Sequence, residues 1–414
     1  MLKNIELERA VEMLLSKTDV KQTEEVGILD ALGRILAADV YAGINVPNFN
    51  RSPLDGYAVK ASDTEGATEE TPIILKVIGQ APAGNTFKGN SESKTAVRIM
   101  TGGMIPKGYD TIIKKEDTDD GLELVKIYRG SRAYQNFAGI GEDVKEGEQT
   151  ISKGIKINAG AIGMCAALGI ETVEVFKKPV IGIVSTGSEL KDISEELEDG
   201  KIYNSNLYSI TASLLENNCI PVNLGIAEDT LEGITKQIRN NIEKCDMIIS
   251  TGGASVGDYD LINKVYEELG AETLFWRLKM KPGTPALAAD YNGKLLIGLS
   301  GNPGAALITF ETIVRPIIKK MSGKDNFYRR KITGIMMDDF NRTSSQRRFT
   351  RVRVEIKGEK TEVYLSGKQN PGVLKSMISC NGLIDIAGGS EPLKKGQKVE
   401  VILLSLNEVQ EWYL

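Results

Sequence analysis

Charged, hydroxyl and glycine residues follow four apolar runs in the middle of the chain. The runs are Ile181–Val184, Pro221–Ile226, Met247–Ile249 and Leu295–Leu299, and a short polar turn follows each one. Glycine lets the backbone approach a ligand closely, and successive amides in a turn can bind an anion. Carboxylates and hydroxyls add oxygen ligands for a hard metal. If the turns converge, this chemistry suits a phosphorylated substrate.

Threonine-glycine pairs occur in three turns, at Thr101-Gly102-Gly103, Thr186-Gly187-Ser188 and Thr251-Gly252-Gly253. Any one of them fits a simple tight turn equally well. The third continues through Ser255 to Asp258, which is longer than a turn needs and favours phosphate binding. Its glycines lack the dinucleotide-binding spacing, and the turn 300–304 lacks the Gly-Lys-Ser/Thr of a P-loop. These departures disfavour a conventional kinase or GTPase.

Four carboxylates belong to the same edge: Glu189, Asp229, Asp258 and Asp260. Several acids beside glycine turns suit Mg²⁺ that bridges substrate phosphates. Helix capping is the alternative, because Asp229 and Asp260 each precede a helical pattern. Acids that only cap need no neighbours of their own charge, so the grouping favours a metal role.

Three cations alternate in Arg277-Leu278-Lys279-Met280-Lys281, after a predicted strand at Glu272–Trp276. Alternation places the three on one side, where they could bind an oxyanion. A solvated charged face is the other interpretation. The rigid Pro282-Gly283 that follows favours a fixed position for Lys281.

Composition limits the possible functions. The 414 residues include no histidine, which excludes a Ser-His-Asp triad and histidine-ligated zinc or iron built from this chain. The net charge of −5 argues against nucleic acid as the main partner. No window resembles a membrane helix or a signal peptide, and the four cysteines are scattered. We therefore expect a cytoplasmic protein with no membrane partner.

Helical patterns separate the apolar runs and position the turns. They are predicted at Ser205–Asn217, Thr230–Lys244, Leu261–Leu269 and Ala305–Lys319. Alternating strands and helices predict a mostly parallel, doubly wound α/β sheet, whose ligand crevice lies beyond the carboxyl ends of the strands. The turns should therefore meet at one site.

Four regions are expected. Residues 1–47 and 138–178 form a discontinuous N-terminal domain with mixed helices and strands, including helices at Ile5–Ser16 and Ala31–Ala38. Residues 48–137 form a β-rich inserted domain. Residues 179–325 form the α/β domain, and 326–414 a C-terminal β-barrel, because period-two segments separated by turns begin near Arg330.

The motifs resemble those of the MoeA family, the molybdopterin molybdenumtransferases, to which the gephyrin E domain is similar. The segment Ser52–Val59 resembles the family's Ser-x-Met-Asp-Gly-Tyr-Ala signature. Further motifs match in order, and the resemblance spans essentially the whole chain: Arg98–Gly103, Ser185–Leu190, Gly252–Asp258, Lys281–Gly283, Gly301–Pro303 and Asn381–Ile384.

This resemblance implies a concrete reaction. Adenylylated molybdopterin and molybdate are the substrates, AMP is released with the help of Mg²⁺, and the metal is left on the dithiolene sulfurs. It also implies a homodimer whose cleft is shared between the α/β domain of one subunit and the inserted domain of the other. Other implied partners are the molybdopterin adenylyltransferase and recipient molybdoenzymes.

The resemblance also implies roles for particular residues. Asp55 and Thr101 would reach in from the partner, and Glu189, Asp229 and Asp260 would manage Mg²⁺ and the phosphoanhydride. Lys281 would hold molybdate together with Arg351 and Ser376. The catalytic residues are expected to be Asp55, Thr101, Glu189, Asp229 and Lys281. The substrate contacts are expected at Thr186, Gly187, Ser188, Gly252, Gly253, Ser255, Asp258, Arg277, Lys279, Pro282, Gly301, Asn302, Pro303, Arg351 and Ser376.

Several residues depart from the family pattern. Leu54 replaces methionine, Arg277 stands where lysine is often found, and Ala138 replaces an arginine. Ser300 replaces a proline, and Gly304 lies in a changed turn. Alternatives stay open: an adenylyltransferase, whose fold resembles the α/β region, a tungstate-inserting paralogue, or a non-catalytic scaffold.

Overall fold

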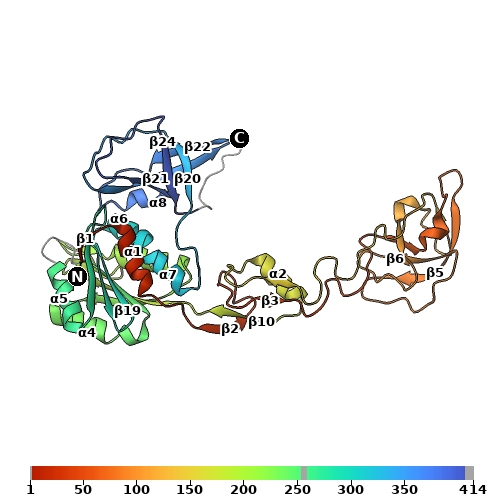
Figure 1. Cartoon of the computed structure of the whole chain (residues 1–414), viewed down its shortest axis with the longest axis horizontal. Coiled ribbons are helices and arrows are strands. Elements are labelled where there is room, and N and C mark those ends of the chain that lie inside the picture. The colour runs from red at the N-terminus through yellow and green to blue at the C-terminus, as the bar shows by residue number, and fades with distance from the viewer. Residues whose placement is uncertain (1, 253–258, 406–414) are drawn as a thin grey trace. The chain divides into compact units, whose positions relative to one another are not determined.

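The structure is a computed structural model that describes residues 2–252 and 259–405, with the backbone alone for Tyr259 and Asp260. It has two compact units (Figure 1). One comprises Met1–Glu25, Gly33–Ala37 and Glu174–Leu414, and the other comprises Val26–Leu32 and Ala38–Val173. The chain passes between them where β2 (Thr23–Gly27) pairs with β10 (Thr172–Phe176).

A seven-stranded sheet in the order β1-β16-β18-β19-β15-β11-β14 forms the base of the first unit. The four apolar runs become strands that pair in parallel, as predicted, whereas β18 is antiparallel to β16 and β19. The strands are β1 (Leu2–Ile5), β11 (Val180–Thr186), β14 (Ile220–Ala227), β15 (Met247–Thr251), β16 (Glu272–Leu278), β18 (Leu287–Tyr291) and β19 (Lys294–Leu299).

Helices cover both faces of this sheet, which confirms a doubly wound α/β fold (Figure 1). One face packs against α1 (Leu7–Ser16), α3 (Ser205–Glu216), α6 (Pro303–Thr309), the π-helical turn η4 (Phe310–Val314) and α7 (Arg315–Met321). The other packs against α4 (Leu231–Arg239), η3 (Ile242–Lys244) and α5 (Tyr259–Leu269). Both interfaces are continuous clusters of buried hydrophobic side chains.

The direction of winding reverses between β11 and its neighbour β15. The helix after β11 is α3, on one face, whereas the helix after β15 is α5, on the other. Connections that leave adjacent parallel strands towards opposite faces open a crevice at the strand ends, and ligands bind there in sheets of this kind. The turns at Thr186 and Gly252 lie at this point.

The C-terminal part of the first unit is a β-barrel, as predicted. Its sheet runs β17-β21-β22-β20-β24-β23, and a further pairing of β21 with β23 closes it. The strand β17 comes from the α/β part and pairs with β21. The elements are β17 (Met280–Lys281), β20 (Lys331–Met336), β21 (Arg347–Lys357), β22 (Lys360–Leu365), α8 (Lys375–Ile378), β23 (Gly382–Ile386) and β24 (Lys398–Leu403).

The second unit contains a five-stranded sheet in the order β7-β4-β6-β5-β8. Its elements are β4 (Gly56–Val59), η1 (Ala61–Thr64), β5 (Ile73–Ala81), β6 (Thr95–Ile99), β7 (Thr111–Lys114), η2 (Lys115–Asp117) and β8 (Leu124–Ile127). A smaller part holds β3 (Val40–Tyr41), which pairs with β9 (Gln149–Ile151), and helix α2 (Ala159–Ala167).

Two short strands of the first unit, β12 (Leu190–Lys191) and β13 (Ile202–Tyr203), also pair.

Two helix predictions need correction. Ala31–Ala38 forms turns and a bridge between Leu36 and Val175 rather than a helix, and Gly33 has a φ of 75° that interrupts helical geometry. The helix predicted at Ala305–Lys319 contains the π-helical turn η4 immediately before Pro316. Proline has no backbone N–H to donate, which explains a wider turn at that point.

The first strand and helix belong to the sheet unit. β1 pairs with β16, and the buried side of α1 packs into the same core as α7. The predicted domain of residues 1–47 and 138–178 did not include the pairing of β1 with the seven-stranded sheet. A four-residue edge strand is too short to show a period in the sequence. The four-domain boundaries themselves stay a prediction.

Candidate functional site

Three glycine turns meet at the carboxyl ends of β11, β15 and β19. A Cβ added to Gly252 would lie 1.9 Å from the carbonyl oxygen of Thr186, and one on Gly301 would lie 3.3 Å from the Cα of Gly252. Gly252 also has a φ of 103°, which side chains rarely adopt. Only glycine allows this approach. The structure therefore brings together the turns that the sequence predicted to converge.

Hydroxyl and amide groups line the base of this crevice. The hydroxyl of Ser185 lies 3.1 Å from that of Thr251 and 3.2 Å from Oδ1 of Asn204. Asn206 donates from Nδ2 to the carbonyl of Gly301 at 2.9 Å. Helix α3 positions both asparagines, since Asn204 caps its first turn by accepting from the amide of Leu207.

Three buried polar atoms at this crevice have no hydrogen-bond partner among the residues that the structure describes: Thr186 Oγ1, Asn204 Nδ2 and Asn206 Oδ1. Leaving such atoms unsatisfied costs free energy, so a ligand or water is expected there. Thr186 was predicted to contact the substrate, whereas Asn204 and Asn206 were not among the predicted site residues. Their place in the first turn of the helix after β11 is the signal that could have found them.

The predicted acids do not form a cation site by themselves. The carboxylate of Glu189 lies over Gly187, whose added Cβ would be 2.6 Å from Oε2. Asp229 follows β14, but Thr230 caps α4 in its place, because α4 begins at Leu231 and the side chain of Thr230 reaches the amide of Gly233. Asp260 is the second residue of α5 rather than its cap.

Among the side chains that the structure describes, no group of three or more acids or cysteines gathers closely enough to hold a metal ion. The predicted residues Gly253, Ser255 and Asp258 lie outside the described residues. The residues described do not fit a preformed Mg²⁺ site, so we derive no chemical step through magnesium.

A cavity of about 320 Å³ adjoins the third turn, where the α/β part meets the barrel. Lys281, Ser300 and Asn302 line it, as do Arg342 and Arg348 of the barrel. The pairing of β17 with β21 creates this proximity, since it sets Lys281 beside Arg348. Ser300 and Asn302 also belong to the turn that touches Gly252, so the cavity and the crevice share one wall.

Close packing fixes the loop that carries Lys281. Gly283 has a φ of 102°, and an added Cβ would lie 2.4 Å from Oγ1 of Thr309. Pro282 lines the cavity, and Thr284 donates to the carbonyl of Met280 at 2.6 Å. The Lys281 backbone is therefore held in place.

The other two predicted cations lie elsewhere. Lys279 forms an exposed ion pair with Glu6 at 2.8 Å. The guanidinium of Arg277 lies over the ring of Trp276 at 5.1 Å. Arg277 has a φ of 71°, which breaks the alternation expected from the sequence. Of the three, only Lys281 lines the cavity.

Arg351 is almost completely buried behind the loop 368–373, with 1% of its surface exposed. Its guanidinium donates to the carbonyls of Lys368, Asn370 and Val373 at 3.0 to 3.2 Å. Burial lowers the pKa of Arg351 from its usual range. Ser376 is also buried and donates to the carbonyl of Val373. Both residues bind the loop that forms one wall of the cavity.

Gly304 connects Arg351 to the third turn. Its amide donates to the carbonyl of Pro371 at 3.0 Å, and a Cβ there would lie 2.4 Å from Nη1 of Arg351. Gly304 is one of the positions that depart from the family pattern. Because glycine has no side chain, it leaves space for the buried guanidinium of Arg351. Pro303 begins helix α6, a position where its missing N–H costs no helical hydrogen bond.

In the second unit, Asp55 and Thr101 contact each other. Asp55 Oδ1 accepts hydrogen bonds from the amide and the hydroxyl of Thr101 at 2.7 and 2.8 Å. The pairing of β4 with β6 brings the two motifs together, with Gly56 opposite Ile99. These two hydrogen bonds lower the pKa of Asp55, and the one from the amide has the larger effect.

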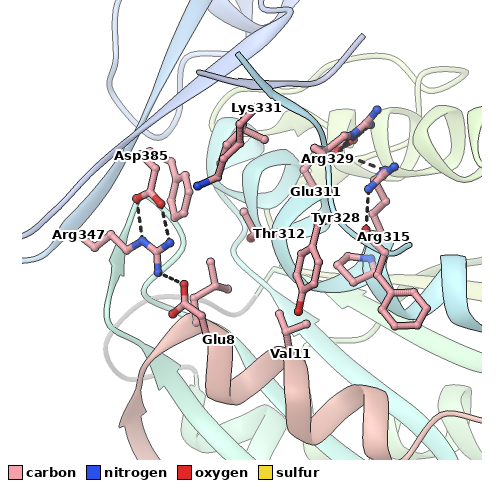
Figure 2. A pocket seen from close by; sticks show the side chains of 15 residues that line it. Glu8, Val11, Glu311, Thr312, Arg315, Tyr328, Arg329, Lys331, Arg347 and Asp385 are labelled. Atoms are coloured by element: carbon pink, nitrogen blue, oxygen red, sulfur yellow. Dashed lines mark hydrogen bonds and ion pairs between the residues drawn. The ribbon is translucent and has the colours of Figure 1, made fainter. Parts of the chain in front are cut away.

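A second cavity, of about 270 Å³, lies between α1, α7 and the barrel (Figure 2). Its walls are largely apolar, and two ion-pair groups flank them. Arg347 points towards both Asp385 and Glu8, while Glu311 binds Arg329 (Figure 2). None of the predicted site residues that the structure describes lines this cavity, which is separate from the glycine turns at Gly187 and Gly301.

A doubly wound α/β domain with a glycine-lined crevice, joined to a barrel through a cationic cavity, is an arrangement suited to an anionic ligand. Family models match most of the chain. They are described as MoeA N-terminal region (domain I and II), probable molybdopterin binding domain, and MoeA C-terminal region (domain IV), at residues 5–169, 182–320 and 333–404. The chain belongs to the MoeA family.

Individual relatives agree with this assignment. The chain is 34% identical over 412 residues to a molybdopterin molybdenumtransferase of Bacillus subtilis, covering 99% of this chain and 96% of that one. It is 33% identical to one of Staphylococcus epidermidis, covering 98% and 97%. The crystal structure of the molybdopterin biosynthesis moeA protein from Pyrococcus horikoshii OT3 matches with a TM-score of 0.81 at 30% identity, covering 97% of this chain and 100% of that one.

In the part of the chain that the structure describes, no helix combines the length and apolar character needed to cross a membrane.

Proposed function

We propose that this protein is a molybdopterin molybdenumtransferase of molybdenum cofactor biosynthesis. It inserts molybdate into adenylylated molybdopterin and releases AMP. Relatives bearing that name align with almost the whole chain. The single observation that carries the proposal is a cavity with three cations that shares a wall with a glycine-lined crevice. One compartment suits an oxyanion, and the other suits phosphates.

The crevice would bind the nucleotide and pterin phosphates. Glycine turns at Gly187, Gly252 and Gly301 offer backbone amides. The unpartnered Thr186 Oγ1 and Asn204 Nδ2 can each donate a hydrogen bond to a phosphate oxygen. These groups are fixed before the substrate arrives, so they stabilise developing charge without reorganisation.

Lys281 would stabilise negative charge from the cavity side. The packed Gly283 keeps the backbone of Lys281 fixed. The substrate itself supplies the sulfurs that take the metal, so the chain needs no histidine. The proposed mechanism is therefore electrostatic: donors and cations bind charge on the leaving AMP and on the incoming oxyanion.

Asp55 and Thr101 would act from a second copy in a homodimer, as the family resemblance implies. The hydrogen bonds between them hold the carboxylate of Asp55, an acceptor, next to the hydroxyl of Thr101. This supports the proposal that the two groups reach the substrate together. Binding of Mg²⁺ by Glu189, Asp229 and Asp260 is likewise part of the proposal. The oxygen chemistry of these acids supports it. A cytoplasmic setting, the adenylyltransferase and recipient molybdoenzymes complete it.

The testing experiment is molybdate-dependent AMP release by the purified protein. Adenylylated molybdopterin is supplied with Mg²⁺ or with a chelator, and molybdate or tungstate is titrated. We expect release that rises with molybdate and falls at least tenfold in Lys281→Gln. Lys279→Gln is the matched control, because Lys279 pairs with Glu6 and does not line the cavity.

Other outcomes would contradict the proposal. Bound substrate with no AMP release would indicate a non-catalytic paralogue. ATP consumption without molybdate would indicate an adenylyltransferase. Release that responds only to tungstate would identify the other metal as the substrate.

A further inference from the structure

The cavity between α1, α7 and the barrel is apolar over most of its wall and has a volume of about 270 Å³ (Figure 2). The apolar part of the wall is formed by Leu7, Val11, Pro316, Phe327, Phe349 and Ile402. An apolar cavity of about 150 Å³ is large enough to bind a benzene ring. This cavity therefore has room for one ring that carries a short polar arm.

Two arginines at one end of the cavity share a single carboxylate. Arg329 donates three hydrogen bonds to Glu311, from Nε and Nη2, at 2.9 to 3.0 Å. The Nε of Arg315 lies 3.9 Å from the same carboxylate, which is too far for a hydrogen bond. Within the described part of the chain, this buried Nε has no hydrogen-bond partner. The group of three thus has one more guanidinium than it has carboxylates.

Arg315 is held rigidly at the cavity wall. Only 9% of its surface is exposed, and its Nη1 donates to the carbonyl of Phe327 at 3.0 Å. Burial, and after it the charge of Arg329, lowers the pKa of Arg315 to about 10. A buried donor without a partner costs free energy, and a carboxylate from a ligand would remove that cost.

The backbone beside Arg315 is also unusual. The π-helical turn η4 ends immediately before it and contributes Glu311 and Thr312 to the cavity wall. Single π-helical turns within α-helices are frequent at functional sites. The wider turn therefore lies at the same end of the cavity as the unpartnered donor.

The other ion-pair group has the opposite balance of charge. Arg347 binds two carboxylates, Asp385 and Glu8, through hydrogen bonds of 2.6 to 2.7 Å (Figure 2). Lys331 also lines the cavity, but it forms an ion pair with Glu400 at 2.7 Å. A second negative charge on a ligand would therefore lie near two acids. The cavity suits a ligand with one carboxylate at one end only.

We propose that this cavity is a binding site for a small aromatic monocarboxylate. The ligand carboxylate accepts a hydrogen bond from Nε of Arg315, and the ring lies against the apolar wall. The site goes beyond the proposed function, because the cavity is separate from the one beside Lys281 and from the turns at Gly187 and Gly301. Its ligand is therefore additional to the substrates.

Isothermal titration calorimetry of the full chain with phenylacetate tests the site, in the absence of molybdopterin and molybdate. Three further compounds separate its requirements. Phenylacetamide has a similar shape but no charge, acetate lacks the ring, and phenylmalonate has a second carboxylate. We expect phenylacetate to bind about tenfold more tightly than each of the three, because a hydrogen bond to a buried charged group contributes about 1.5 to 3 kcal/mol.

Variants locate the ligand in this cavity. Arg315→Gln should remove the preference for phenylacetate over phenylacetamide. Arg330→Gln is the matched control, because Arg330 follows Arg329 in the chain but is exposed and does not line the cavity. Thr312→Phe places a ring in the cavity and should abolish the binding of phenylacetate.

Thermal unfolding without ligand shows whether each variant is folded. If Arg315→Gln does not fold, Arg315→Lys takes its place. It keeps the charge but loses Nε, so it should retain only part of the preference for phenylacetate.

Several outcomes would overturn the inference. The wild type could fail to bind phenylacetate, or bind it no better than phenylacetamide. Binding that persists in Thr312→Phe would place the ligand elsewhere, and tighter binding of phenylmalonate would exclude a site for monoanions. Failure of the proposed function is distinguishable from all of these. A protein that releases no AMP from adenylylated molybdopterin would still give the same titrations with phenylacetate.

Discussion

Lys281 and Arg348 are direct partners in the parallel pairing of β17 with β21. Two cations thus share one side of a short ladder, with the cavity between their side chains. Like charges opposite each other destabilise a sheet, so this pairing has a cost when no anion is bound. The same arrangement provides the attraction for an oxyanion, which explains why a fold would keep it.

Lys281→Gln should therefore stabilise the protein slightly while it reduces activity. Removing one of two facing cations is expected to raise the free energy of unfolding by about 0.5 kcal/mol in buffer free of oxyanions. Lys279→Gln should instead lower it by about 0.5 kcal/mol, because an exposed pair with Glu6 is lost. Urea unfolding of both variants measures the contrast, and changes of the same sign would refute it.

Arg351→Met should destabilise the barrel. Three carbonyls of the loop 368–373 would lose their donor inside the protein, at a cost of about 3 kcal/mol. Arg351→Lys should recover little, because one ammonium group cannot replace a planar set of donors. Arg353→Met, on the same strand but more exposed, is the control. Unchanged stability of Arg351→Met, with molybdate binding lost, would instead make Arg351 a direct ligand.

Gly252→Ala should separate the glycine turns. Its Cβ would overlap the carbonyl of Thr186, and its φ of 103° is strained for alanine. We expect a loss of about 2 to 4 kcal/mol in the free energy of unfolding. Gly293→Ala also has a positive φ, 83°, but open space around it, so it should cost only about 1 kcal/mol. Similar losses of unfolding free energy in Gly252→Ala and Gly293→Ala would show that the positive φ, and not the overlap with Thr186, determines the cost.

The periodic parts of the fold could be predicted from the sequence. Apolar runs such as Leu295–Leu299 are long enough, and bounded clearly enough by turns, to identify the buried parallel strands. The convergence of the glycine turns followed from parallel topology. β1 and Ala31–Ala38 were not predictable in this way, since tertiary pairing with β16 and Val175 decides their conformation.

The cationic cavity could not be derived from the residues alone. Arg348 lies in a strand with five basic residues, Arg347, Arg348, Arg351, Arg353 and Lys357, and nothing in their spacing says which one faces Lys281. Only the register of β17 with β21 makes that choice. The sequence pattern likewise placed Arg277 and Lys279 beside Lys281, because it could not show the positive φ of Arg277.

Asp385→Asn should lower the free energy of unfolding more than Glu8→Gln does (Figure 2). Asp385 takes two hydrogen bonds from Arg347, at 2.7 and 2.6 Å, and is 22% exposed. Its loss should cost about 2 kcal/mol. Glu8 takes one and is 62% exposed, so its loss should cost about 0.5 kcal/mol and fade in 1 M salt. Equal costs in urea unfolding would contradict this ranking.

Asp55 should titrate below the usual range of an aspartate because Thr101 donates to its charged form. Its pKa is lower in the folded than in the unfolded chain. The two hydrogen bonds therefore stabilise the fold above the unfolded pKa of about 3.9, and that contribution is lost as the pH falls through the folded pKa.

Thr101→Val removes the hydroxyl but keeps the amide, which is the stronger of the two influences, so the pKa of Asp55 should rise only part of the way. NMR titration of the aspartate carboxyl carbons measures it. Asp120 is the internal control, because its pKa is lowered chiefly by Lys115 and should not move. An unchanged Asp55 pKa in Thr101→Val would show that the hydroxyl does not bind the carboxylate, and the pair would then present no common site to a substrate.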